Sequence, residues 1–302
     1  MSALSPCQSV VAAVGMFDGV HAGHSTLIRA LTDAARARGA RSMVLTFMRH
    51  PLELLRPADA PRSLCSADVR RRRLLELGVD DVEFIDFTPE FRALTGREFL
   101  RMLKEKYGVS ALVVGFNNHF GSDRLDAISA RTVAAEESVE IIPAPALALP
   151  ESTDVSSSCI RAAIAAGDVE KAAALLGRPY TLEGRVGHGA ALGREIGFPT
   201  ANLRPDDIRA AIPAEGVYAV DVEIPHLGLS RRGITNIGRR PSIDSADGSL
   251  SLETHILDFD ADIYGRTILL HFLSRLRDEQ KFPDMESLRS QLSADALRAR
   301  SL

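Results

Sequence analysis

The sequence predicts an α/β domain built on a parallel sheet, followed by a small β-barrel that a final helix covers. Three observations lead to this fold class. In the first half, short apolar runs alternate with segments of helical periodicity, the pattern of βαβ units. From about residue 180 onward, short strand patterns follow one another with turn residues between them, which favours a barrel. The length of 302 residues suits about two domains.

The first half contains the elements of a parallel sheet. Strands are expected at 10–15, 42–47, 82–87, 111–116 and 140–143. Apolar residues recur at helical spacing from Leu27 to Ala35, Gly39 ends that helix, and further helices are expected at 68–77 and 96–107. In such a sheet the ligand is expected in the crevice at the carboxyl ends of the strands.

The second half of the chain has a different pattern, in which successive strands are not separated by helices. An irregular connector at 144–150 precedes two short helices at 158–166 and 169–176, which we expect to form a bridge. Strands are expected at 180–186, 217–224, 233–237, 251–259 and 267–273, and a helix at about 284–299. We therefore predict a first domain at 1–178, including bridging helices at about 156–178, and a second domain at 179–302.

Composition narrows the function classes. The hydrophobic fraction of 45% and charged fraction of 25% are those of an ordinary globular protein. A net charge of -4 lacks the basic footprint of a general nucleic-acid binder. The three cysteines, Cys7, Cys65 and Cys159, predict neither a disulfide framework nor a zinc site and suit a reducing cytoplasm. We expect no signal peptide and no membrane span, because basic amino-terminal and long apolar segments are absent.

A glycine- and histidine-rich segment follows the first expected strand and precedes a helix. Its glycines allow the backbone to approach a ligand closely, and the helix offers free N–H groups and a positive dipole end to a phosphate. His21 and His24 would lie at that end, where imidazoles can offset charge that develops during phosphate transfer. The alternative is an ordinary solvated loop, because a short H-x-G-H match is common by chance.

Three further features bear on the sites. Serines at 156–158 open another helix, where they can cap it or contact phosphate, and Arg161 in its first turn could contact phosphate oxygens. The alternative there is a plain serine cap with a solvated arginine. The arginine run at 70–73 predicts a solvated helix face.

The barrel half contains a second glycine-rich segment, at 184–197, that is not a P-loop because no GK[ST] follows it. Thr200 and Asn202, just after it, offer hard oxygen ligands suited to Mg²⁺ shared with nucleotide phosphates. Glu253 lies in an alternating strand pattern and could accept a proton from an attacking hydroxyl. The alternative is a glycine-rich hairpin with a surface glutamate.

These segments resemble the bacterial bifunctional riboflavin kinase/FMN adenylyltransferases, also called FAD synthetases. The family's G-x-F-D-G-V-H-x-G-H segment is similar to 15–24, its T-F-x-x-H-P segment to 46–51, and its S-S-T-x-I-R segment to 156–161. The resemblance implies that the first domain is a Rossmann-like HIGH-type nucleotidyltransferase. It implies ATP-binding residues at Gly15, Phe17, Asp18, Gly19, His21, Gly23, His24, Ser157 and Arg161, and flavin-binding residues at His50, Pro51 and Asn117.

The second half resembles riboflavin kinase over three ordered motifs: the P-T-A-N segment at 199–202, the L-E-x-H-x-L-D-F strand at 252–259, and the R-D-E-x-K-F segment at 277–282. The resemblance implies a six-stranded Greek-key barrel with Glu253 as the base. It implies kinase ATP-binding residues at Gly187, Gly189, Gly193, Gly197, Pro199, Thr200 and Asn202, with Thr200 and Asn202 holding Mg²⁺. The substrates would then be riboflavin, FMN and ATP. An N-I-G-x-R-P segment that begins at Asn236 matches the family near the substrate.

Two departures from the family pattern leave alternatives open. Met16 stands where the family usually has Asn, and Asn117 where it has a carboxylate that could help to hold Mg²⁺. One alternative is therefore a monofunctional riboflavin kinase with an impaired first domain. Another is a flavin-binding regulator without turnover, and a third transfers CMP or AMP to a different phosphate compound.

Overall fold

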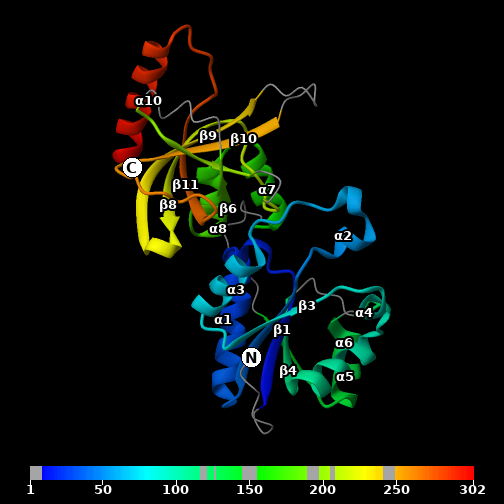
Figure 1. The fold of residues 1–302 in the computed structure, drawn as a ribbon. Helices are drawn as coiled ribbons and strands as arrows, with labels where there is room; N and C mark the ends of the chain where they lie inside the picture. Colours follow the sequence, from blue (N-terminus) through cyan, green and yellow to red (C-terminus); the bar gives the residue numbers. More distant parts are fainter. Residues whose placement is uncertain are drawn as a thin grey trace. The chain divides into compact units, whose positions relative to one another are not determined.

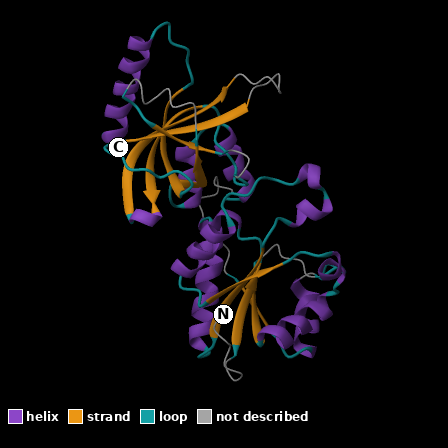
Figure 2. Ribbon diagram, in the orientation of Figure 1, coloured by secondary structure: helices purple, strands orange, loops and turns teal. Residues whose placement is uncertain are grey.

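The computed structural model describes residues 9–115, 121–125, 127–144, 155–188, 197–204, 208–240 and 249–302. The chain divides into two compact units. Unit 1 comprises 1–61 and 67–154, and unit 2 comprises 62–66 and 155–302. Each unit is built around its own sheet (Figures 1 and 2).

Unit 1 contains a five-stranded parallel sheet with strand order β3-β2-β1-β4-β5. Its strands are β1 (Val10–Val14), β2 (Arg41–Phe47), β3 (Asp81–Ile85), β4 (Val109–Val114) and β5 (Glu140–Pro143). The predicted parallel sheet is confirmed. The central strand β1 is buried on both faces, as expected when helices cover a parallel sheet on two sides.

Helices cover both faces of this sheet (Figure 1). On one face, α1 (Ala22–Ala37) and α3 (Ala67–Glu76) bury Ile28, Leu31 and Leu74 against Val11 and Ala13. On the other face lie α5 (Gly96–Tyr107) and α6 (Ala127–Glu136). The shorter elements of unit 1 are η1 (Asp18–Val20), α2 (Pro51–Leu55), η2 (Pro57–Asp59) and α4 (Pro89–Ala93). The residue pattern does not predict α2, α4 and α6, of which α2 and α4 are too short to show helical periodicity.

Unit 2 contains a closed antiparallel barrel with strand order β10-β7-β6-β11-β8-β9. Its strands are β6 (Tyr180–Gly187), β7 (Thr200–Leu203), β8 (Gly216–Ile224), β9 (Leu229–Arg240), β10 (Ser249–Ile256) and β11 (Thr267–Arg277). The predicted six-stranded barrel is confirmed. Strand β7 was not expected from the residue pattern, because four residues give too little alternation. It closes the barrel by pairing with both β6 and β10.

The final helix, α10 (Met285–Arg300), covers part of the outer barrel surface. Its residue Ala299 is buried with Val217, Ile234 and Leu276 in a small apolar cluster. The predicted terminal helix is therefore confirmed. Among the described residues, no helix is long and apolar enough to cross a membrane.

The two bridging helices, α7 (Ser157–Ala165) and α8 (Val169–Leu176), pack within unit 2. Their apolar residues join the barrel core. The sequence predicts these helices in the first domain, whereas in the structure they pack with the barrel; the domain boundary at 178 stays a prediction.

Unit 2 also takes in five residues from the middle of the first half of the chain. Leu64 is buried in its core, and the Ser63 carbonyl accepts a hydrogen bond from the Ala211 N–H at 2.7 Å. Ser66 Oγ hydrogen-bonds Glu183 of β6 at 2.5 Å. No sequence pattern marks this segment, because its partners lie more than ninety residues later in the chain.

Candidate functional site

The histidine loop of unit 1 lies between the end of β1 and the start of α1. His21 is the N-cap of α1, and its Nδ1 accepts a hydrogen bond from the His24 N–H at 3.4 Å. The two imidazole rings stack with their centroids 3.7 Å apart, and the Phe17 ring meets His24 edge-on at 5.2 Å. The structure therefore brings both predicted histidines together at the positive end of a 16-residue helix.

The backbone of this loop is strained. Phe17 has φ 47°, Gly19 φ 75° and Val20 φ 44°. A β-branched residue such as Val20 is a genuine outlier at positive φ, and each such conformation costs about 1–3 kcal/mol. Asp18, between them, is 3% exposed. Gly15 packs closely against this loop, because a Cβ there would lie 3.2 Å from the Phe17 ring. Backbone strain that the surrounding structure maintains is typical of functional loops.

Arg70 of α3 lies beside the same loop, and the prediction of a solvated face is wrong for this residue. Arg70 is 3% exposed and donates to the Met16 and Phe47 carbonyls, each at 2.8 Å. It also stacks over the Phe84 ring at 5.2 Å. The adjacent Arg71 is exposed. A run of four arginines carries no helical periodicity that could have distinguished the buried member.

His50 and Pro51 begin the short helix α2. His50 Nδ1 accepts from the Leu52 N–H at 3.2 Å, and Pro51 occupies the first helical position. Both residues therefore have a local capping role, which is compatible with the predicted flavin contact but does not test it. Asn117, the third predicted flavin residue, lies outside the described residues.

An aromatic cluster lies next to that segment and was missed by the sequence analysis. The rings of Phe47, Phe87 and Phe91 meet edge-to-face with centroids 5.5–5.8 Å apart. Met48, which follows Phe47, is 48% exposed. Phe47 belongs to the T-F-x-x-H-P motif, but the other two rings come from a segment about forty residues later that shows no motif.

Ser157 and Arg161 lie at the start of α7, in unit 2. Ser156 rather than Ser157 is the N-cap, accepting from the Cys159 N–H at 3.3 Å. Arg161 Nε donates to the Arg62 carbonyl at 2.9 Å. These two predicted ATP ligands therefore belong to a different compact unit from His21 and His24.

The barrel site is organised by strand register. Glu253 on β10 lies opposite Asn202 on β7 and opposite Asn236 on β9. Directly opposite residues project from the same face with Cβ atoms about 4.5–5.5 Å apart. Leu252 and Thr254 are buried on the inner face, so Glu253 and the two amides share the outer face. Adjacent strands thus assemble a carboxylate between two amides.

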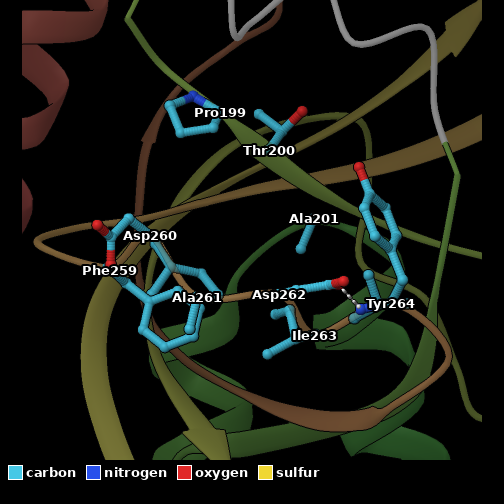
Figure 3. A pocket seen from close by; sticks show the side chains of 11 residues that line it. Pro199, Thr200, Ala201, Phe259, Asp260, Ala261, Asp262, Ile263 and Tyr264 are labelled. Atoms are coloured by element: carbon cyan, nitrogen blue, oxygen red, sulfur yellow. Dashed lines mark hydrogen bonds between the residues drawn. The ribbon is translucent and has the colours of Figure 1, made fainter.

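Two cavities lie next to the strands that carry Asn202, Glu253 and Asn236. The first, here the loop cavity, measures about 530 Å³, and Pro199 and Thr200 face the 259–264 segment across it (Figure 3). The second, here the helix cavity, measures about 380 Å³ and lies beneath α10. Its polar lining residues are Thr200, Asn236, Glu253, His255, Arg277, Glu279 and Gln280, and its apolar ones are Phe198, Val217, Ile234, Phe282, Met285, Leu288 and Leu292. Thr200 lines both cavities.

Local contacts hold residues 197–200, the segment whose Thr200 lines both cavities. Gly197 adopts φ 81°, a turn conformation that glycine favours. His255 Nδ1 donates to the Pro199 carbonyl at 2.8 Å, and its ring meets Phe198 edge-on. Gly187 pairs with Asn202 in the strand register. Gly189 and Gly193, also predicted as nucleotide ligands, lie outside the described residues.

Glu279, which follows β11, lines the helix cavity, and Asp295 on α10 pairs with Arg277, another residue that lines it. Asn236 Nδ2 donates to Glu279 Oε1 at 3.3 Å, and a Cβ at Gly238 would lie 2.1 Å from that oxygen. Glu279 can therefore approach β9 only because residue 238 is glycine. Arg277 pairs with Asp295 of α10 at 2.8 Å, and Asp295 is fully buried. The R-D-E-x-K-F motif includes Arg277 and Glu279, but the motif alone predicts no chemical role for either residue.

Family models match both halves of the chain. One described as FAD synthetase matches residues 5–159, and one described as riboflavin kinase matches residues 176–302. The chain belongs to the bifunctional riboflavin kinase/FMN adenylyltransferase family. Relatives with that name are 39% identical in Pseudomonas fluorescens, covering 97% of this chain and 92% of the relative, and 37% identical in Escherichia coli K12, covering 98% and 93%.

A solved structure agrees with this family membership over the full length. The crystal structure of a Streptococcus pneumoniae protein named a macrolide-efflux protein is 36% identical, with a TM-score of 0.85, covering 99% of this chain and 95% of that one. The name macrolide-efflux protein belongs to the Streptococcus pneumoniae protein and is not transferred to this chain. The likeness supports both the parallel-sheet unit and the barrel unit of the family fold.

Proposed function

We propose that the chain catalyses both reactions of its family. In the barrel unit, riboflavin is phosphorylated by ATP to give FMN and ADP. In the parallel-sheet unit, FMN is adenylylated by a second ATP to give FAD and pyrophosphate. The observation that carries the first assignment is Thr200, which lines both the loop cavity and the helix cavity and lies on the same outer face as Glu253.

The two cavities suit the two kinase substrates. The helix cavity has an apolar part under α10, which suits a flat tricyclic ring, and a polar part, which suits a polyol chain. Val186 and Pro199, which line the loop cavity, flank the glycine-rich residues 187–197 in the sequence, so we assign this cavity to ATP. The phosphoryl group would then cross from one cavity to the other beside Thr200.

Glu253 is the proposed general base. It accepts the proton of the ribityl 5′-hydroxyl as that oxygen attacks the γ-phosphorus of ATP, and ADP leaves. Asn202 and Asn236 flank the carboxylate on the neighbouring strands and fix the polar end of the substrate. Positioning of this kind accounts for much of the rate enhancement in phosphoryl transfer.

The Thr200 hydroxyl and the Asn202 carbonyl oxygen fit Mg²⁺, because this ion prefers hard oxygen ligands and keeps phosphate oxygens and water as the others. When bound with ATP, the ion would neutralise phosphate charge. Neither protein ligand is charged, which suits an ion that arrives with its nucleotide.

The adenylyl transfer is assigned to the histidine loop. An FMN phosphate oxygen attacks the α-phosphorus of ATP and pyrophosphate leaves, so no side chain acts as nucleophile. His21, His24 and the N-terminus of α1 stabilise the developing charge. The phenylalanine cluster at Phe47, Phe87 and Phe91, with His50 and Pro51 beside Phe47 in sequence, offers an apolar surface for the flavin ring.

The Met16 departure does not remove an interaction that the structure uses. The contacts at this position are made by the Met16 backbone carbonyl, which any residue supplies. The family models that match both halves of the chain favour two active units over a kinase with an impaired first domain.

A time course of flavin products tests the proposal. The purified protein is incubated with riboflavin, ATP and Mg²⁺, and the flavins are separated by chromatography, with a parallel run on reduced flavin. We expect FMN followed by FAD. FMN alone under both conditions would support the monofunctional kinase, and tight flavin binding without product would support the regulator.

Two reciprocal variants test the separation of the sites. Glu253→Gln should abolish FMN formation but retain FAD formation from supplied FMN, and His24→Ala should do the reverse. Glu223→Gln and His226→Ala, which change the same residue types on β8 and in the turn that follows it, are the matched controls. Loss of both activities in either test variant, with the fold intact, would contradict the two-site assignment.

A further inference from the structure

Arg70 is the buried member of an otherwise partly exposed arginine run on α3. It is 3% exposed, whereas Arg71 is exposed and Arg73 pairs with Glu76 within the same helix. A guanidinium is rarely buried unless its donors are satisfied. The two terminal nitrogens of Arg70 donate hydrogen bonds at the ends of two neighbouring parallel strands.

The contacts of Arg70 join β1 and β2 where both strands end. One terminal nitrogen donates to the Met16 carbonyl at 2.8 Å and to Thr46 Oγ1 at 3.3 Å. The other donates to the Phe47 carbonyl at 2.8 Å. The carboxyl edge of a parallel sheet is where ligands bind, so this arginine lies beside the candidate site rather than in a distant core.

The Met16 carbonyl is held from two directions. It accepts from Arg70 at 2.8 Å and from the Thr46 hydroxyl at 2.9 Å, which occupies both of its lone pairs. The next residue is Phe17, whose φ of 47° begins the strained loop. Strained backbone persists only where its surroundings over-determine it, and these two donors fix the peptide plane immediately before the strain.

The strained loop in turn places the histidines. The Phe17 carbonyl accepts from the Val20 N–H at 3.0 Å, and the Phe17 ring contacts His24. His21 follows Val20 directly and caps α1. A continuous path of contacts therefore runs from Arg70 through Met16 and Phe17 to His24.

We propose that Arg70 is a positioning residue for adenylyl transfer, which holds the histidine loop in its strained conformation without touching substrate. The inference rests on the adenylyltransferase function proposed above. Because Arg70 acts on geometry, its loss should lower kcat for FAD formation more than it raises KM for FMN. A displacement of about 1 Å at reacting groups can reduce a rate about 100-fold.

Three variants test this role. Arg70→Met removes all the donors but keeps an apolar chain over Phe84. Arg70→Lys keeps one ammonium that can reach the Met16 carbonyl. Arg71→Met is the matched control, because Arg71 also stacks on Phe84, at 5.0 Å, and also donates to a strand carbonyl, at Val82, away from the histidine loop.

Two readouts are made on the full-length protein. The first is kcat and KM for FAD formation from FMN, with FMN formation by the same preparation as a control for the amount of active unit 2. The second is hydrogen exchange of the amides at 16–24, which reports loop opening whether or not the loop is catalytic. Thr46→Val, which removes the other donor to Met16, serves the same comparison if Arg70→Met does not fold.

We expect Arg70→Met to lower kcat for FAD formation about 100-fold, with partial rescue by Arg70→Lys and no change in Arg71→Met. Hydrogen exchange at 16–24 should accelerate most in Arg70→Met, less in Arg70→Lys and not at all in Arg71→Met. FMN formation should stay at the wild-type level in all three variants. Wild-type kcat with wild-type exchange in Arg70→Met would overturn the inference. A wild-type protein that forms no FAD would instead refute the proposed function, and the exchange comparison would still decide whether Arg70 holds the loop.

Discussion

The ion pair between Arg277 and Asp295 should hold α10 over the helix cavity. The Asp295 side chain is 1% exposed and that of Arg277 16%. Arg277 Nε donates a hydrogen bond to Asp295 Oδ2 at 2.9 Å, and Arg277 Nη2 lies 2.8 Å from the same oxygen. Removing one partner of a buried pair leaves the other charge uncompensated and costs about 3–5 kcal/mol. Because Arg277 retains some exposure, we expect the lower end, about 3 kcal/mol, for Asp295→Ala.

That loss should be visible as a lower melting temperature of unit 2. For a unit of this size, 1 kcal/mol corresponds to about 2–4 °C, so the expected decrease is about 6–12 °C by scanning calorimetry. The KM for riboflavin should rise as well, since α10 contributes Met285, Leu288 and Leu292 to the helix cavity. FAD formation from supplied FMN, assigned to unit 1, should be unaffected below the melting temperature.

A second ion pair on the same helix is the control. Two hydrogen bonds join Arg300 and Asp258, but their side chains are 49% and 67% exposed. An exposed pair contributes at most about 1 kcal/mol, so Arg300→Ala should change the melting temperature little. Equal effects of Asp295→Ala and Arg300→Ala would refute the reasoning, because burial is the difference on which it depends.

Three further predictions concern other parts of the molecule. Leu64→Ala should destabilise unit 2 by about 2–5 kcal/mol, although residue 64 lies between unit 1 elements in the sequence, and an unchanged urea midpoint for loss of kinase activity would contradict this. Gly238→Ala should slow FMN formation about tenfold with little loss of stability, because the new Cβ would displace the exposed Glu279 carboxylate that accepts a hydrogen bond from Asn236. Unchanged kinase kinetics would show that this contact is dispensable. The Ser42 backbone N–H lowers the pKa of the Asp80 carboxyl below its ordinary value of 3.8, so the stabilisation is complete above pH 3.8 and is lost as the pH falls through the lowered pKa. The stability difference between wild type and Asp80→Asn should therefore shrink in acid, and a constant difference in urea melts across that range would rule this out.

The sequence by itself determined the two-domain plan of the protein, a parallel-sheet domain followed by a barrel domain. Periodicity predicted the parallel sheet, the barrel and the terminal helix, and the helix 96–107 and the strand 140–143 have the predicted bounds. These elements are long or regular enough for local pattern to decide them. The residue pattern also placed His21 and His24 between a strand and a helix, because the apolar residues on either side of them predict both elements.

Only the tertiary structure decided which distant residues meet. The position of Glu253 opposite Asn202 and Asn236 depends on antiparallel register, which is a property of paired strands and not of any one of them. The short strand β7 exists because two neighbours pair with it, so its own four residues could not predict it.

The same reason explains Arg70 and Leu64. A charged run on a helix is usually solvated, and only the carbonyls at the ends of β1 and β2 make burial of Arg70 favourable. Leu64 is one apolar residue in a polar segment, and its packing in unit 2 depends on residues more than ninety positions later in the chain. Local propensity acts over a few residues, whereas these contacts arise from how the whole chain folds.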